Sequence, residues 1–380
     1  MLTSRSFLNL CAAGALSLSA LSLVSCDGSG IYEDLSPCET AHKITFNFDY
    51  NMSFAEGFKN NVHSVAIYGF DKQTGLLEFV LTERGDKLAQ DGFALDLDGV
   101  APGDYDIVSW CGMDNSLTGT HEENFRLSDP VVGETTRDEL ICRLERDIQQ
   151  DGSHHFEGEM YDLFYGKVAE VKIHEPNETP GEVHTYNVPL KKNTNGVWLI
   201  LQQLSGDNME AGEFTYTITD NNGTMNADNE VDGTAPKITF HPFEVREAEA
   251  ELGADEYPNI STKGFTMPVN RPQFIEPGQK KTRAQITNRC AVAHFTIPRL
   301  MTDHRSILTI YNDKQEMVCQ VPLQPYALLT KYKVQDDQEF LDRQDDYRFT
   351  FFLDENKKWV SSSIIVNSWK IKVNQGGFGN

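Results

Sequence analysis

A histidine stands beside two carboxylates at one point of the chain, and two histidines are adjacent at another; such groups could bind a metal ion or exchange protons. His121, Glu122 and Glu123 are consecutive, and His154 is followed by His155. The HExxH spacing that holds zinc in many proteases does not occur. We therefore expect these histidines to be surface residues without a catalytic role.

Two aspartate-rich turns could bind calcium. The first is Asp96-Leu-Asp98-Gly99, and the second begins at Asp228. The downstream ligands of a calcium loop are missing after the first turn, and Thr239 replaces the twelfth-position Glu of the second. The sequence also lacks a GxSxG motif, a phosphate-binding glycine loop and a dinucleotide fingerprint. We expect no enzyme activity, no cofactor and no metal.

One cysteine has a clearer chemical context. Arg5 precedes an apolar stretch, Leu8–Val24, and the sequence Leu23-Val24-Ser25-Cys26 follows. This ending resembles the bacterial lipobox, in which the cysteine sulfur is acylated and becomes the new N-terminus. Two or three acyl chains bind a membrane durably, whereas one binds marginally. We expect a signal peptide over 1–25 and lipid attachment at Cys26; the alternative is an ordinary secretory signal with a chance cysteine.

The remaining cysteines of the exported chain could form disulfides, because exported proteins fold in oxidising compartments. They are Cys38, Cys111, Cys142, Cys290 and Cys319. We expect the pairs Cys111–Cys142 and Cys290–Cys319, each within one domain. The odd count leaves Cys38 unpaired or paired between chains.

Length and charge limit the class of protein. The chain has 380 residues, more than one hydrophobic core usually holds, so we expect two domains. Its 33 basic and 57 acidic residues give a formal net charge of −24, which opposes nucleic-acid binding. Beyond the N-terminus, no apolar run has the length that a bilayer requires.

The hydrophobic pattern predicts an all-β protein. Ile44, Phe46 and Phe48 alternate with polar residues, which is typical of a strand with one buried face. Long helices rarely separate the strands, so two antiparallel β-sandwiches in tandem fit best. We expect a tether over 26–42 and domains over 43–178 and 179–380, with the boundary near Pro176–Gly181.

Two segments leave alternatives open. Residues 136–148 fit helical and strand spacing, and we favour a strand. Residues 244–285 are polar, with room for a short helix or a long insertion. The expected strands are Ile44–Tyr50, Val65–Phe70, Leu76–Leu81, Phe93–Leu97, Tyr105–Trp110, Tyr161–Gly166, Val168–Ile173, Tyr186–Leu190, Val197–Leu201, Phe214–Thr219, Lys237–Phe243, Cys290–Ile297, Ile307–Tyr311, Met317–Leu323, Tyr347–Leu353 and Ile364–Val373.

Several short sequence segments, taken in their order along the chain, resemble those of a known protein family. Ile31-Tyr-Glu-Asp-Leu-Ser-Pro-Cys38 follows the lipobox, and Pro102-Gly-Asp-Tyr105 runs to Trp110. Near the end come Phe340–Asp354 and Ile364–Trp369. The mature chain resembles the FimB-type fimbrial anchor lipoproteins of the Bacteroidota over essentially its whole length.

The resemblance implies two transthyretin-like β-sandwich domains and a place in the outer membrane, exposed on the surface as part of a fimbrium. It implies a base subunit that attaches the major shaft subunit to the cell and limits elongation. Fimbrial subunits of this type join by donor-strand exchange, a form of β-augmentation. Whether this chain donates or accepts a strand stays open.

The distribution of arginine bears on this role. In such fimbriae a protease cuts the shaft subunit after an arginine and releases its first strand. From Cys26 through Glu83 the chain contains no arginine, and Arg84 is the first. A cut there removes more than one strand, so we expect the first strand and its lipid to stay attached.

Two other functions remain open. The chain could be a fimbrial tip or accessory adhesin. It could also be a surface glycan-binding lipoprotein, since aromatic residues make up 10% of the sequence. In alternating strands, however, aromatic residues mostly fill the core.

Overall fold

The computed structural model describes residues 40–113, 124–252, 258–261, 286–331, 335–367 and 369–372. Strands dominate this part of the chain, so the all-β prediction is confirmed. The described α-helices are short: α1 (Phe58–Asn61), α2 (Leu323–Leu328) and α3 (Asp337–Arg343). Short 3₁₀ turns lie at Asp86–Ala89, Arg137–Glu139 and Ala211–Glu213.

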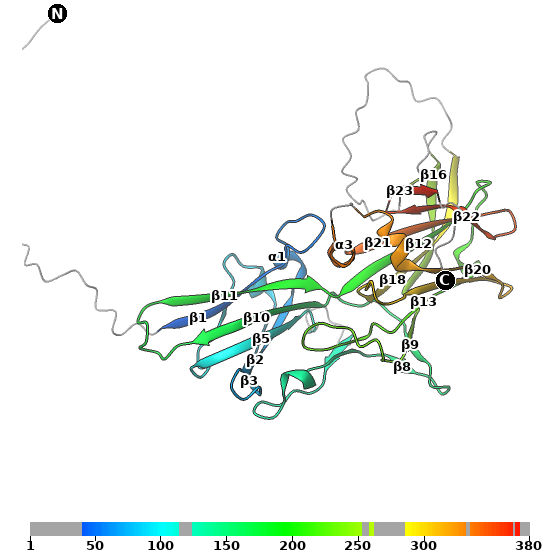
Figure 1. Cartoon of the computed structure of the whole chain (residues 1–380). Helices are drawn as coiled ribbons and strands as arrows, with labels where there is room; N and C mark the ends of the chain where they lie inside the picture. Colours follow the sequence, from blue (N-terminus) through cyan, green and yellow to red (C-terminus); the bar gives the residue numbers. More distant parts are fainter. Residues whose placement is uncertain are drawn as a thin grey trace, which may run out of the picture.

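The first sheet contains seven strands from the N-terminal half (Figure 1). In spatial order they are β3 (Leu77–Arg84), β2 (Ser64–Asp71), β5 (Gly103–Cys111), β10 (Phe164–Ile173), β11 (Val183–Lys192), β1 (Ala41–Asn47) and β4 (Leu95–Asp96). Two apolar clusters cover its two faces: Ile67 and Phe164 belong to one, Tyr68 and Trp110 to the other. This arrangement follows from the alternation of side chains along a strand.

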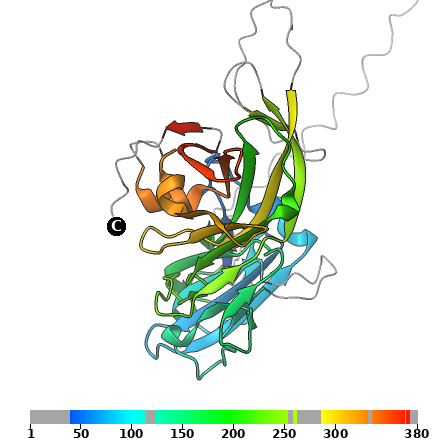
Figure 2. The ribbon, with the colours of Figure 1, turned by 90° about the vertical axis from the view of Figure 1, so that its right-hand side faces the viewer.

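The second sheet also has seven strands, drawn from the C-terminal half. Their order is β17 (Pro258–Ser261), β16 (Glu244–Leu252), β18 (Ile286–Pro298), β12 (Thr194–Gln203), β21 (Asp346–Leu353), β22 (Trp359–Val366) and β23 (Trp369–Lys372). After a 90° turn, Figure 2 shows the yellow to red C-terminal strands beyond one end of the blue and cyan sheet.

Two further sheets contain strands from both halves of the chain. The larger has the order β20 (Met317–Pro322), β19 (Ile307–Asn312), β13 (Phe214–Asp220), β15 (Ile238–Phe240), β9 (His154–Phe156) and β8 (Asp147–Ile148). The smaller has the order β14 (Thr224–Met225), β7 (Cys142–Leu144) and β6 (Phe125–Leu127). The halves are therefore joined by backbone hydrogen bonds as well as by the chain.

The expected boundary between residues 178 and 179 does not separate the sheets. Pro176–Gly181 lies in the connection between β10 and β11, which are antiparallel neighbours in the first sheet. The change of sheet comes at Asn193, the single residue between β11 and β12. One apolar cluster contains both Trp110 of the first sheet and Phe349 of the second, so it spans both halves. A proline-glycine turn marks a hairpin as readily as a domain linker.

The sheets are mixed rather than purely antiparallel. β1 runs parallel to β11, β12 to β21, and β9 to β15. Each parallel pair joins segments distant in sequence, and local patterns carry no information about such pairing.

One ambiguous segment agrees with the sequence expectation and two others differ from it. The strand structure favoured for residues 136–148 is present as the short strands β7 and β8, which follow a 3₁₀ turn at Arg137–Glu139. Glu244–Leu252 is a strand, β16, rather than a helix or loop. The expected strand Ile364–Val373 is a hairpin, because Asn367 turns the chain with a φ of 48° between β22 and β23.

Candidate functional site

The first strand is the structural element on which the expected anchor role depends. β1 lies between β11 and the two-residue strand β4. Its register with β11 runs from Ala41 opposite Val183 to Asn47 opposite Pro189. The first strand is thus inserted along its whole length, with β11 on one side and β4 covering part of the other.

Apolar contacts hold β1 in the sheet. Ile44, Phe46 and Phe48 are buried on one face. The Phe46 ring stacks on Phe58 of α1 at 5.6 Å between centroids, and Phe48 meets Phe164 of β10 edge-on at 5.0 Å. Burial of each such ring stabilises the fold by roughly 1.5–3 kcal/mol. Release of the strand would open a large apolar groove.

Arg84 lies at the end of β3, and its Cα is paired with that of Ser64 in β2. β2 is a central strand between β3 and β5. A cut after Arg84 would therefore separate β1, β2 and β3 together from the remaining chain. Cleavage at this arginine therefore cannot release β1 alone.

The loop after β1 is attached to the second half of the molecule. The Arg343 guanidinium of α3 lies 4.1 Å from the Tyr50 ring centre and 4.5 Å from that of Phe54. Its Nη1 also donates to the carbonyl of Asp49 at 3.3 Å. Cation–π contacts of this kind contribute about 0.5–2 kcal/mol each, depending on solvent exclusion.

Next to Arg343 in α3, Asp342 forms a buried ion network that also connects the two halves. The carboxylate of Asp342 is 1% exposed and contacts Arg299 Nη1 at 3.0 Å and Lys191 Nζ at 2.6 Å. Lys191 belongs to β11, so the network ties the first sheet to α3. Arg299 Nη2 also donates to the carbonyl of Asn229 at 2.6 Å. The segment Phe340–Asp354 contains Asp342 and Arg343, but no local sequence pattern indicates these roles.

The candidate lipid site and part of the expected chemistry lie outside the described residues. These are Cys26 with the signal peptide, Cys38, and His121, Glu122 and Glu123. Within the described residues, no helix has the length and apolar character needed to cross a membrane.

The four described cysteines do not form the expected disulfides; all are buried free thiols. Cys111 belongs to the apolar cluster on one face of the first sheet, whereas Cys142 belongs to the cluster on the other. Cys290 lies in a small cluster with Ile200, away from the main core that contains Cys319. Both disulfides were predicted because the partners lie within the same half of the sequence. In the structure the two cysteines of each pair lie in different apolar clusters, because side chains alternate between the faces of a strand.

The other candidate residues make ordinary structural contacts. His155 Nδ1 lies 2.9 Å from His241 Nε2, and Asp228 forms ion pairs with Arg137 and Lys167. Asp96 pairs with Lys43 across β1 and β4 at 3.0 Å. Among the residues that the structure describes, no three His, Cys, Asp or Glu side chains are arranged so that they could hold a metal ion together.

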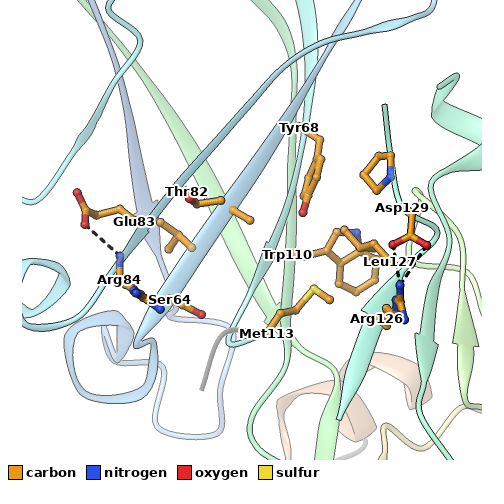
Figure 3. A pocket seen from close by; sticks show the side chains of 13 residues that line it. Ser64, Tyr68, Thr82, Glu83, Arg84, Trp110, Met113, Arg126, Leu127 and Asp129 are labelled. Atoms are coloured by element: carbon orange, nitrogen blue, oxygen red, sulfur yellow. Dashed lines mark hydrogen bonds and ion pairs between the residues drawn. The ribbon is translucent and has the colours of Figure 1, made fainter. Parts of the chain in front are cut away.

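A cavity of about 680 Å³ lies beside the first sheet, between β2, β3, β5 and β6 (Figure 3). Tyr68 and Trp110 form its aromatic wall, and Arg126 pairs with Asp129 at 3.0 Å on the opposite side. The described residues that line it include no histidine or cysteine.

Comparison with known proteins identifies the family. Residues 35–375 match the family model described as fimbrillin-A associated anchor proteins Mfa1 and Mfa2. The chain belongs to this family. Membership places it among proteins associated with surface fimbriae. No curated protein sequence matches the chain.

Solved structures share the fold of this anchor-family chain. The fimbrial anchor protein Mfa2 from Porphyromonas gingivalis is 15% identical, with a TM-score of 0.60 over 89% of this chain and 100% of that one. A proposed adhesin from Bacteroides thetaiotaomicron is 22% identical, with a TM-score of 0.67 over 90% and 100%. A proposed polysaccharide-binding protein from the same species is 23% identical, with a TM-score of 0.66 over 89% and 99%.

Proposed function

We propose that this chain is the lipid-anchored base subunit of a fimbrium. Acyl chains on Cys26 hold it in the outer membrane, and its β modules bind the major shaft subunit through a strand interaction. A subunit that stays fixed in the membrane also limits elongation of the polymer. Family membership and the lipobox sequence support this role.

The observation that carries the proposal is the position of the first arginine. A shaft subunit needs a cleavable site between its first strand and the rest of the fold. Here Arg84 comes only after β1, the central strand β2 and β3. The lipid-bearing N-terminus therefore stays continuous with the sheet that must resist pulling.

The contacts of β1 provide a path for mechanical load. Tension on the N-terminal tether reaches β1 first, and β1 is hydrogen-bonded to β11. From the end of β1, the Tyr50 loop contacts Arg343 of α3, and Lys191 of β11 contacts Asp342. Force is thereby distributed from one strand into both halves of the molecule.

Substitution of the acylated residue tests the proposal. We expect Cys26→Ala cells to lose the protein from the membrane fraction and to shed fimbriae or carry abnormally long ones. Cys38→Ala is the matched control, because it removes a nearby cysteine and leaves the lipobox intact. Unchanged membrane attachment and fimbriae in Cys26→Ala cells would contradict the base-subunit role.

Immunogold labelling separates this role from the two alternatives. A base subunit is labelled at the cell-proximal end of each fimbrium. A tip or accessory adhesin is labelled at the distal end or along the shaft. Labelling independent of fimbriae, with unchanged fimbriae after gene deletion, would indicate a surface glycan-binding lipoprotein.

A further inference from the structure

Three histidines meet at the N-terminal end of the first strand: His42 of β1, His174 just after β10, and His184 of β11. The His42 ring centroid lies 5.3 Å from that of His174 and 5.0 Å from that of His184. The rings of His174 and His184 are 4.4 Å apart. We call these residues the histidine cluster.

His42 is the buried member of the cluster, with 5% of its surface exposed. Its Nε2 accepts a hydrogen bond from the backbone N–H of His174 at 3.1 Å. An imidazole nitrogen that accepts has no proton of its own. A proton added at Nε2 would replace this acceptor with a donor that faces another donor.

The opposite nitrogen of His42 also favours the neutral ring. Nδ1 is buried and has no hydrogen-bond partner among the described residues, so none of their carboxylates contacts it to balance a positive charge. Burial lowers the pKa of His42, and the neighbouring His184 and His174 lower it further. A protonated His42 would be a buried cation beside two titratable rings.

The surrounding charges lie outside this buried position. Glu182 Oε2 is 3.5 Å from His184 Nε2, and Glu178 pairs with Lys172 at 3.3 Å; both carboxylates are exposed. The groups facing His42 from the packed elements are His174, His184 and Tyr186, with Lys172, Glu178, Glu182, Lys43 and Asp96 around them.

We propose that the histidine cluster makes the attachment of the first strand to the sheet sensitive to pH. In its neutral form it packs the start of β1 against β10 and β11. Protonation of His42 places a positive charge in this buried position and favours opening of the N-terminal end of β1. At this end, Ala41 N donates to Glu182 O at 2.9 Å and Thr40 N to Pro176 O at 3.0 Å. This concerns the fold itself and holds whether or not the chain is acylated.

The direction of the pH effect follows from proton linkage. Because the pKa of His42 is lower in the folded strand than in the open one, the open state binds more protons. The stabilisation is fully present above the ordinary histidine pKa of about 6.5 and is lost as the pH falls below it. Uptake of one proton changes the opening equilibrium by about tenfold per pH unit.

Hydrogen–deuterium exchange of the full mature chain tests the proposal. Peptides covering β1 are compared with peptides covering β12 between pH 7.5 and pH 5.0, after correction for intrinsic exchange. We expect β1 to lose protection progressively below about pH 6.5, by up to about tenfold per pH unit, while β12 keeps its own. In His42→Gln this loss should be absent, since an amide oxygen can accept the His174 N–H without titrating. His63→Gln, at an exposed histidine before β2, should behave like the wild type.

Retention of β1 protection in the wild type down to pH 5.0 would overturn the proposal. An equal loss in His42→Gln would overturn it as well. If His42→Gln does not fold, His184→Gln provides the second test, because it removes one titratable neighbour. Its pH midpoint of opening should shift downward, and an unshifted midpoint would show that the cluster is not the sensor.

Discussion

At the scale of single residues, burial decides how reactive the cysteine thiols are. Burial raises the pKa of Cys111 and of Cys319 to about 12, and that of Cys290 to about 11. Near pH 7 these thiols stay protonated, and protonated thiols are poor nucleophiles. Burial therefore keeps them unreactive in the folded protein.

We predict that iodoacetamide leaves these three cysteines unmodified in the native protein at pH 7.5. After unfolding in urea without reductant, the same residues and Cys142 should be fully labelled, as mass spectrometry of the peptides would show. A reductant should not change the melting temperature. Labelling that requires prior reduction would reveal disulfides and contradict the arrangement of the four thiols.

Arg343 is the residue that attaches the first-strand loop to the second half. We predict that Arg343→Lys lowers the free energy of unfolding by about 1 kcal/mol, because lysine keeps the charge but loses the planar face over Tyr50 and Phe54. Urea denaturation measures this change. Arg305→Lys, at an exposed loop residue before β19, is the control, and an equal effect there would mean that stacking contributes nothing.

At the scale of elements, the alternating pattern located most strands but not their partners. Ile44, Phe46 and Phe48 correctly indicated a strand with a buried face. The parallel partner of β1 is β11, which begins 136 residues after the last residue of β1, and no local sequence pattern encodes that pairing. The pattern also gave no indication of α3, whose Asp336 cap accepts from two backbone N–H groups.

The two faces of β1 should respond differently to truncation. We predict that Phe46→Ala lowers the free energy of unfolding by about 3–5 kcal/mol, since the ring fills the core against Phe58. Thr45→Ala, which alters the opposite face, should cost less than about 1 kcal/mol. Chemical denaturation compares the two variants, and similar losses would contradict the described orientation of β1.

At the scale of the whole molecule, the two halves share sheets and core. Only one histidine of the histidine cluster, His42, could be suspected from sequence, because it interrupts the apolar face of β1. The other two reach it through the β10–β11 connection and the parallel pairing. The ion network around Asp342 was likewise beyond sequence analysis, because its members come together only through tertiary packing.

This shared core predicts cooperative unfolding. Urea unfolding followed by pulsed hydrogen exchange should give the same midpoint for peptides from β2 in the first sheet and β18 in the second. Backbone pairing of β9 with β15 and of β7 with β14 couples the halves. Two well-separated midpoints would instead indicate independent tandem domains.

The most direct test of the anchor account is the N-terminus of the protein on fimbriated cells. Mass spectrometry of the chain purified from membranes should find an acylated peptide that begins at Cys26 and continues without a break through Arg84 into Gly85. Such a chain carries its lipid and its first strand together. A population that begins at Gly85, or a Cys26 without acyl chains, would contradict the account.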